Sequence, residues 1–125
     1  MIKIQNVHLS KLLTIYAKLL EADFPSTKDA LEHIKRSNAI EVSYKITESA
    51  REAIVKKYKL DGVNKEDEEA NKKANEAYTK VLLEEVELDL TPFSEEVLLS
   101  VNLKPVEILR LKELKLFIEE EPNKE

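Results

Sequence analysis

The chain has one glycine, Gly62, among its 125 residues. Glycine adopts positive backbone φ angles at little cost, and the loops that cradle phosphate groups or form tight catalytic turns use several such positions. The chain also has no cysteine, no tryptophan and only two histidines, His8 and His33. The sequence is therefore short of the residues from which phosphate-binding loops, metal sites and nucleophilic active sites are commonly built.

The same shortage of glycine favours helices. Hydrophobic residues make up 42% of the chain and charged residues 36%, with only four prolines, which is typical of helices that have a solvated face. A chain of this length fits one domain with its own core. We expect one helical domain over residues 1–118, followed by a flexible acidic tail over residues 119–125.

The balance of charge excludes several kinds of partner. Acidic residues number 25 and basic residues 20, for a net charge of −5, which disfavours binding to a nucleic acid polymer. No stretch of 18 apolar residues is present, and no apolar segment follows the first residues, so the pattern indicates neither a membrane span nor a targeting signal. The absence of cysteine suits a reducing compartment. We therefore expect a cytoplasmic protein that does not bind membranes.

The first part of the chain predicts a strand followed by a helix. Residues 2–5 alternate between apolar and polar side chains, which is the period of a short strand. Apolar residues then recur every three or four positions over residues 7–21, which predicts an amphipathic helix. Its apolar stripe consists of Leu9, Leu12, Leu13, Tyr16, Leu19 and Leu20.

A short second helix is predicted to begin at Ser26. Ser26 followed by Asp29 resembles a capping box, and the helix that it opens would bury Leu31 and Ile34. His33 lies beside that stripe, so we expect it at the surface or partly packed. Residues 39–46 fit two patterns, because their apolar positions alternate like a strand whereas Asn38 and Glu41 have the spacing of a helix start. We favour a helix.

This next helix is predicted to continue to Lys59 and to end at Gly62, which would adopt the left-handed conformation that follows many helices. Asn64 is the predicted cap of a further helix that ends near Glu85. Its stripe of small and apolar residues, Ala70, Ala74, Ala77, Tyr78, Val81 and Leu82, permits a close approach of another helix or subunit.

The rest of the chain predicts a second strand and two helices. Residues 86–90 alternate and are expected to pair antiparallel with residues 2–5. A helical turn or two is expected over residues 94–99. Pro105 suits the first position of a last helix, which we expect to run to about Glu119. The predicted fold is thus mainly α (α+β), with four or five helices and a small two-stranded antiparallel sheet.

No motif predicts catalysis or a bound metal. The two histidines lie 25 positions apart, without the paired spacing of metal ligands. Ser43, Ser49 and Ser94 do not lie in a strand–turn–helix elbow that would mark a nucleophile. The many carboxylates follow the solvated edges of helices. We expect a protein that is not an enzyme and that needs no cofactor or metal.

The best candidate for a binding site lies on the predicted central helix. Its members are aromatic or basic: Tyr44, Lys45, Arg51, Lys57 and Tyr58. The seven-residue spacing of Tyr44, Arg51 and Tyr58 puts them on one helix face, where rings and a guanidinium group can stack a base and hold phosphate. This pattern predicts a site for a small anionic nucleotide. A helix that packs against a partner presents the same pattern, so both interpretations stay open.

Several segments resemble a group of small bacteriophage and prophage proteins of unknown function. That group has a central helix, a charged helix leading into a strand like LLEEEVELDI, and a terminal helix like LTPxxLxxLxFMI. The similar segments here are residues 42–46, 51–58, 61–62, 82–90, 103–109 and 114–118. The resemblance covers about residues 40–118, and it departs from the group in a shorter charged insert after Gly62 and in Lys115–Leu116. It implies a phage origin and transfers no functional residue.

Two functions are consistent with these observations. The first is a non-enzymatic phage accessory protein that counters host antiviral defence, by sequestering a small nucleotide signal or by occluding a host protein. The alternative is a virion-morphogenesis protein, either an assembly chaperone or a minor structural component. The alanine-rich and leucine-rich stripes exceed what a small core can cover, so we also expect a homo-oligomer.

Overall fold

The computed structural model describes residues 1–118. The described chain is mainly helical, as predicted, with five α-helices and a small antiparallel sheet. In chain order the elements are β1 (Ile2–Gln5), η1 (Asn6–His8), α1 (Leu9–Lys18), η2 (Leu19–Glu21), α2 (Thr27–Lys57), α3 (Glu68–Leu83), β2 (Glu85–Leu88), β3 (Phe93–Ser94), α4 (Glu95–Leu99), α5 (Pro105–Glu113) and β4 (Phe117–Ile118), where η marks a short 3₁₀ helix.

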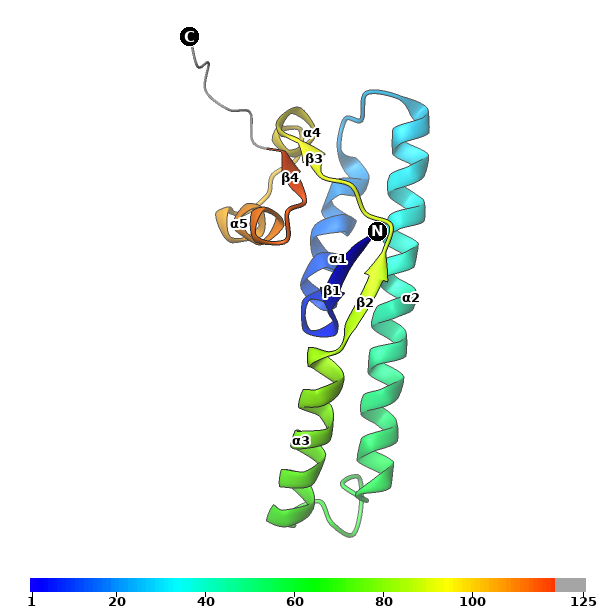
Figure 1. Cartoon of the computed structure of the whole chain (residues 1–125), viewed down its shortest axis with the longest axis vertical. Helices are drawn as coiled ribbons and strands as arrows, with labels where there is room; N and C mark the ends of the chain where they lie inside the picture. Colours follow the sequence, from blue (N-terminus) through cyan, green and yellow to red (C-terminus); the bar gives the residue numbers. More distant parts are fainter. Residues whose placement is uncertain (119–125) are drawn as a thin grey trace.

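The long helix α2 runs along one edge of the molecule (Figure 1). Helix α1 lies against its N-terminal half, and α3 lies antiparallel against its C-terminal half. The elements α4, α5, β3 and β4 gather beside α1 at the end of the molecule where α2 begins. The tail predicted for residues 119–125 lies outside the described residues.

The predicted antiparallel sheet is confirmed. Strand β1 pairs with β2 so that Ile2 lies opposite Leu88 and Ile4 lies opposite Val86. Ile4 and Leu88 are buried, whereas Lys3, which lies between the two isoleucines, is exposed. The alternation seen in the sequence therefore reports one buried face of this sheet.

The core forms around α1. Its buried side chains are Leu9, Leu12, Ile15 and Tyr16, joined by Leu19 from η2. Most of the predicted stripe is thus confirmed, but Leu20 is exposed and Ile15 takes part in its place. The rest of the core comes from distant segments: Ile4, Ile40, Leu88, Leu90, Phe93, Val97, Leu98, Leu103, Leu111 and Leu116.

Helix α2 replaces the two helices that the sequence predicts. Ser26 caps it as expected, since its hydroxyl accepts a hydrogen bond from the N–H of Asp29 at 3.1 Å. Asn38 lies inside this helix and does not cap a new one. Residues 39–46 are helical, which is the alternative favoured from the sequence. A capping residue matters only where backbone N–H groups lack helical partners. No glycine or proline interrupts residues 27–57, so the helix continues through the capping signal.

The predicted cap of α3 is also wrong. The side chain of Asp67, not that of Asn64, accepts a hydrogen bond from the N–H of Ala70 at 3.1 Å. Asn64 instead donates from Nδ2 to the carbonyl of Tyr58 at 3.0 Å, which satisfies an acceptor at the end of α2. Within α3, Ala74 is buried, as expected for a small residue where helices approach closely.

Gly62 does not take the left-handed position that ends α2. Lys59 takes it, with φ of 55°, and the N–H groups of Leu60 and Lys59 donate to the carbonyls of Val55 and Lys56. These two bonds form a Schellman motif. The motif fixes the left-handed residue at the position directly after the C-cap, Tyr58, so a glycine a few residues later cannot occupy it.

A second Schellman motif ends α5 earlier than predicted. Lys115 has φ of 61°, and the N–H of Leu116 donates to the carbonyl of Leu111 at 2.7 Å. Leu111 and Leu116 are both fully buried, so their contact explains why the helix stops at Glu113. Phe117 and Ile118, which the sequence places on the helix, instead form β4 and pair parallel with β3.

Glu107 ties α5 to α1. Its Oε1 accepts hydrogen bonds from the ammonium group of Lys18 at 2.7 Å and from the backbone N–H of Lys104 at 2.8 Å. The hydrogen bond from Lys18 holds the pKa of Glu107 below its ordinary value. Pro105 starts this helix as predicted.

Replacing Lys59 or Lys115 with glycine should stabilise the protein. A side chain in the left-handed region costs about 1–2 kcal/mol, and the larger freedom of glycine in the unfolded chain cancels part of the gain. We expect Lys59→Gly and Lys115→Gly each to raise the free energy of unfolding by about 0.5–1 kcal/mol, measured by urea denaturation.

The matched control is Lys72→Gly, which makes the same chemical change at an exposed position inside α3. It should lower the free energy of unfolding by about 1 kcal/mol. If all three variants lose stability alike, the assignment of Lys59 and Lys115 to left-handed positions is wrong.

Candidate functional site

The five residues predicted to bind a ligand lie along α2 and beyond its end. Tyr44 is half-buried and packs against the core, and Tyr58 is half-buried at the C-cap. Lys45, Arg51 and Lys57 are exposed. Because a helix rises about 1.5 Å per residue, Tyr44 and Tyr58 are separated by roughly 21 Å along the axis. The residues share one helix but do not converge on one point.

The basic members of this set have acidic or aromatic neighbours. Lys45 forms an ion pair with Glu41 at 3.0 Å, and Arg51 forms one with Glu48 at 3.6 Å. The Nζ atom of Lys57 lies 5.5 Å from the ring centroid of Tyr58, a cation–π distance. The prominent hollows among residues 1–118 are lined by other residues.

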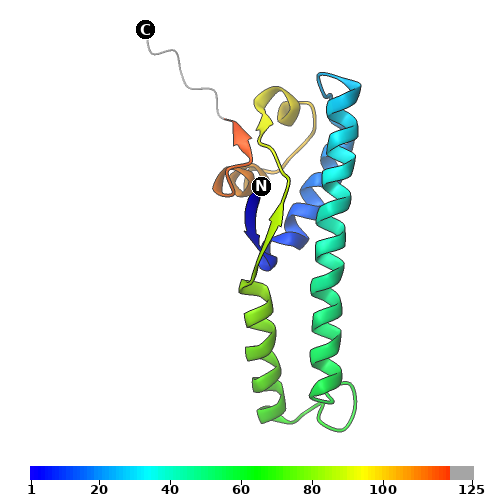
Figure 2. The same ribbon diagram turned by 45° about the vertical axis from the view of Figure 1, so that its right-hand side comes forward.

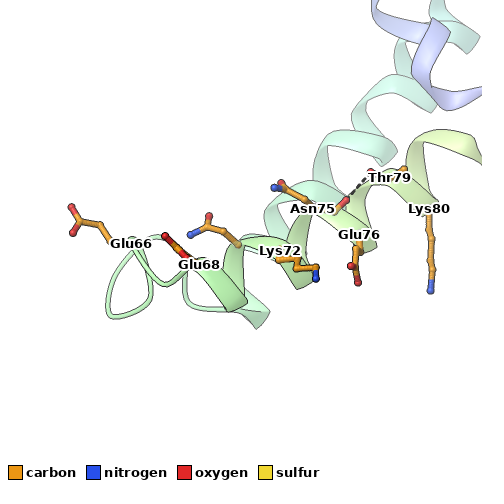
Figure 3. Close-up of a pocket in the computed structure, with 8 residues that line it drawn as sticks. Glu66, Glu68, Lys72, Asn75, Glu76, Thr79 and Lys80 are labelled. Atoms are coloured by element: carbon orange, nitrogen blue, oxygen red, sulfur yellow. Dashed lines mark hydrogen bonds between the residues drawn. The ribbon is translucent and has the colours of Figure 1, made fainter.

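One of these hollows, of about 740 Å³, lies over the outer side of α3. Figure 3 shows that its lining side chains fan out from this one helix and the turn before it. They are all polar: Glu66, Glu68, Asn71, Lys72, Asn75, Glu76, Thr79 and Lys80. The Thr79 hydroxyl donates to the carbonyl of Asn75 at 2.8 Å. A ligand here would be contacted from one side only, so this surface is a solvated helix face.

A cluster of aromatic rings surrounds His33, which is fully buried, whereas the sequence predicts it at the surface or partly packed. Its ring stacks on Tyr16 with centroids 5.2 Å apart and an interplanar angle of 15°. The rings of Phe24 and Phe93 lie 5.0 and 5.7 Å away. His33 therefore joins α2 to α1 and to β3 by ring packing.

The hydrogen bonds of His33 define its protonation. Its Nε2 lies 3.0 Å from the backbone carbonyl of Tyr16, which can only accept, so Nε2 carries the proton. Its Nδ1 is buried without a partner among the described residues. Burial lowers the pKa of His33 and raises the pKa of Tyr16. Both rings are therefore neutral near pH 7.

A cleft of about 190 Å³ borders this cluster, between the start of α2 and the segment around β3. Asp29, His33, Arg36 and Ser94 are among its lining residues. Arg36 donates from Nε to the carbonyl of Asp89 at 3.2 Å. The Nδ1 atom of His33 is buried, so it cannot contact a substrate in this arrangement of the cluster. The geometry assigns His33 a packing role and does not assemble a general base.

The most unusual surface lies on the other side of α2. Leu31, Ile34, Val42 and Ile46 are exposed by 54%, 46%, 58% and 65%, and we call the side of α2 that carries them the outer face. At 3.6 residues per turn it lies roughly opposite the side that buries His33 and Ile40. In Figure 1 the other elements lie to one side of α2, and in Figure 2 α1 passes behind it.

The sequence predicted that Leu31 and Ile34 would be buried, which is wrong. Helix α2 has apolar residues on two opposite sides, and the core contacts only the side of His33, Ile40 and Thr47. The missed signal was the continuation of the Leu31–Ile34 stripe into Val42 and Ile46. The helices of a globular domain normally have one apolar stripe, so a second one of this length is unusual.

Other exposed apolar residues are more scattered. Val63 lies in the turn between α2 and α3, and Val106 and Leu109 lie on α5. Single exposed apolar side chains are ordinary on protein surfaces. The outer face of α2 differs from them because it extends over four helical turns.

Neither a metal centre nor a membrane span is found in residues 1–118. No group of three or more histidine or carboxylate side chains in this part of the chain is placed to hold an ion. Over the same residues, no helix combines the length and the apolar character that a transmembrane segment requires.

Comparison with known proteins gives no relative. No family model, curated protein or solved structure matches the chain. The resemblance to small phage proteins thus stays a prediction.

The burial of His33 should make stability depend on pH. Below about pH 6.5 the unfolded chain takes up a proton on His33, whereas the folded chain, in which the pKa is lower, does not until a lower pH. The free energy of unfolding should therefore fall as the pH drops from 6.5 to the folded pKa, with a slope of at most about 1.4 kcal/mol per pH unit.

Urea denaturation at several pH values between about 5 and 8 tests this. His33→Gln keeps an N–H donor for the Tyr16 carbonyl and cannot titrate in this range, so it should flatten the curve. The control His8→Gln removes the other histidine and should leave the slope in place. An unchanged slope in His33→Gln would show that other groups cause it.

Proposed function

We propose that this protein is a non-enzymatic binding protein that acts through contact with another protein chain across the outer face of α2. The observation that carries the proposal is the exposure of four large apolar side chains along one helix side. A row of exposed large apolar side chains along one helix is typical of protein interaction sites. The buried and unreachable Nδ1 of His33 supports a role without catalysis.

The resemblance to small phage proteins supports the biological setting. In that setting the protein is an accessory protein of the host cytoplasm that counters antiviral defence by occluding a host protein. Sequestration of a nucleotide has less support than occlusion of a host protein. Tyr44, Arg51 and Tyr58 are spread along α2, and Arg51 is already paired with Glu48. An exposed apolar helix side favours a protein partner over an anionic ligand.

Virion morphogenesis is the second candidate, since the same outer face would serve an assembly chaperone or a minor structural component. Mass spectrometry of purified virions separates a minor structural component from a protein that occludes a host protein. The chain should be found at stoichiometric amounts in virions if it is structural. It should be absent from them, and abundant in the infected cytoplasm, if it occludes a host protein.

A charge on the outer face should abolish partner binding. We expect Ile46→Glu to weaken binding to a purified partner by about tenfold or more, because the interface would have to bury an unpaired carboxylate. The partner is first identified by retention on the tagged wild-type chain, and its affinity is then measured by calorimetry.

Thr79→Glu, which adds the same charge on the outer side of α3, is the matched control and should bind normally. Arg51→Ala tests the nucleotide branch. Native mass spectrometry with a panel of cyclic and ADP-ribose-type nucleotides should give no adduct. A tight adduct that Arg51→Ala and Tyr44→Ala remove would contradict the proposal in favour of ligand capture.

A further inference from the structure

We infer that the chain that covers the outer face of α2 is a second copy of this protein, packed antiparallel about a two-fold axis near residues 43 and 44. This inference rests on the proposed function, because it names the occupant of the same surface.

The outer face is long and unobstructed. From Leu31 to Ala53 it extends about 33 Å at the rise of an α-helix. In Figure 1 α2 stands at the edge of the molecule with the other elements to one side, and in Figure 2 α1 passes behind it while nothing lies in front of it. A second helix can therefore lie along α2 without meeting α1 or α3.

The side chains of the outer face match those of a second copy that runs in the opposite direction. With the axis near residues 43 and 44, Val42 lies across from Ile46 of the second copy, and Asn38 lies across from its Ser49. Exposed Ala53 is a small residue and lies across from Ile34 of the second copy, which leaves room for that larger side chain. In these three pairs an apolar residue meets an apolar residue and a polar residue meets a polar one, whereas Leu31 lies across from Lys56, whose aliphatic stem can cover it.

The charges along the edges favour the antiparallel direction. In an antiparallel pair the same edge of each helix meets its copy, which brings Glu41 toward Lys45 of the second copy and Glu32 toward its Lys57. Within one chain Glu41 already pairs with Lys45 at 3.0 Å, and Glu32 pairs with Arg36 at 3.5 Å. The pairs would thus extend into networks across the interface.

A parallel pair would align each residue with its own copy. Lys35 and Asn38 would then meet Lys35 and Asn38 of the second copy near the centre of the face. Like charges and two unpaired amides disfavour that arrangement. The side chains of the outer face therefore favour the antiparallel pair.

The first test is the mass of the intact protein. Native mass spectrometry and light scattering at about 50 µM should give a dimer for the wild type, and Val42→Glu/Ile46→Glu should give a monomer with unchanged helical circular dichroism. Val63→Glu/Val106→Glu adds the same two charges at exposed apolar sites away from the face and should stay dimeric. A wild-type monomer, or dimerisation that survives the outer-face charges, would overturn the inference.

Single cysteines then test the direction of the helices, since the natural chain has no cysteine. About the proposed axis, two copies of Val42 lie within about 5 Å along the helix, whereas two copies of Leu31 lie roughly 38 Å apart. Val42→Cys should form a disulfide dimer on oxidation and Leu31→Cys should not, although Leu31→Cys mixed with Lys56→Cys should. Disulfide dimers of Leu31→Cys alone would indicate a parallel pair and overturn the arrangement.

The two proposals fail separately. If the wild type is a monomer and Ile46→Glu still weakens binding of a different protein, the proposed function stands and the inference of a dimer is wrong. If the wild type is a dimer that binds no other protein, the dimer stands and the proposed contact with a different protein is wrong, because the outer face then serves self-association alone.

Discussion

The packing of α1 on the N-terminal half of α2 is the contact on which the rest of the structure depends. Tyr16 and His33 stack, and the carbonyl of Tyr16 accepts the hydrogen bond from Nε2 of His33. Phe93 then packs against both rings, so β3 and the C-terminal elements are positioned by this pair. Each fully buried large side chain contributes about 1.5–3 kcal/mol. The orphaned Nδ1 of His33 and hydroxyl of Tyr16 offset part of that gain.

The far half of the molecule is held differently. The C-terminal half of α2 and α3 form a hairpin that extends beyond the other elements (Figures 1 and 2). Among its described residues, Thr47 and Ala74 are the buried ones. Its ends depend on local hydrogen bonds at Lys59, Asn64 and Asp67. Most helix stability comes from packing of an apolar face, so we expect this hairpin to be the less stable half of the molecule.

The sequence predicted the fold where a single physical signal decides the outcome. The alternation of residues 2–5 and 86–90, the stripe of α1, the cap at Ser26 and the start at Pro105 each act locally. The errors came from positions where the chain offers two candidates for one role. Asn38 and Asn64 resemble caps but lie where no helix begins, and Gly62 is suited to a left-handed position that hydrogen-bond geometry assigns to Lys59. The residue types alone do not show which of two nearby positions takes the capping or left-handed role.

The surface of α2 was harder to predict, because both of its apolar stripes have helical spacing. Which stripe is buried depends on α1 and β3, which are distant in sequence, and His33 is buried in preference to Leu31 only through its contacts with Tyr16 and Phe93. The same uncertainty applied to Tyr44, whose ring packs on the core. A sequence pattern identifies an apolar helix face by its period, but it does not identify the element that packs against that face.

The scarcity of glycine accounts for two features of this protein at once. Without glycine between Ser26 and Tyr58 the chain has no loop in that region to hold a phosphate group or a catalytic turn. The same lack of breakers lets α2 continue without interruption for 31 residues, although its core contact needs fewer. The outer face lies on the solvent side of this uninterrupted helix, roughly opposite His33 and Ile40. The lack of a glycine-rich loop in this region and the uninterrupted helix that carries the outer face therefore have a common origin in the sequence.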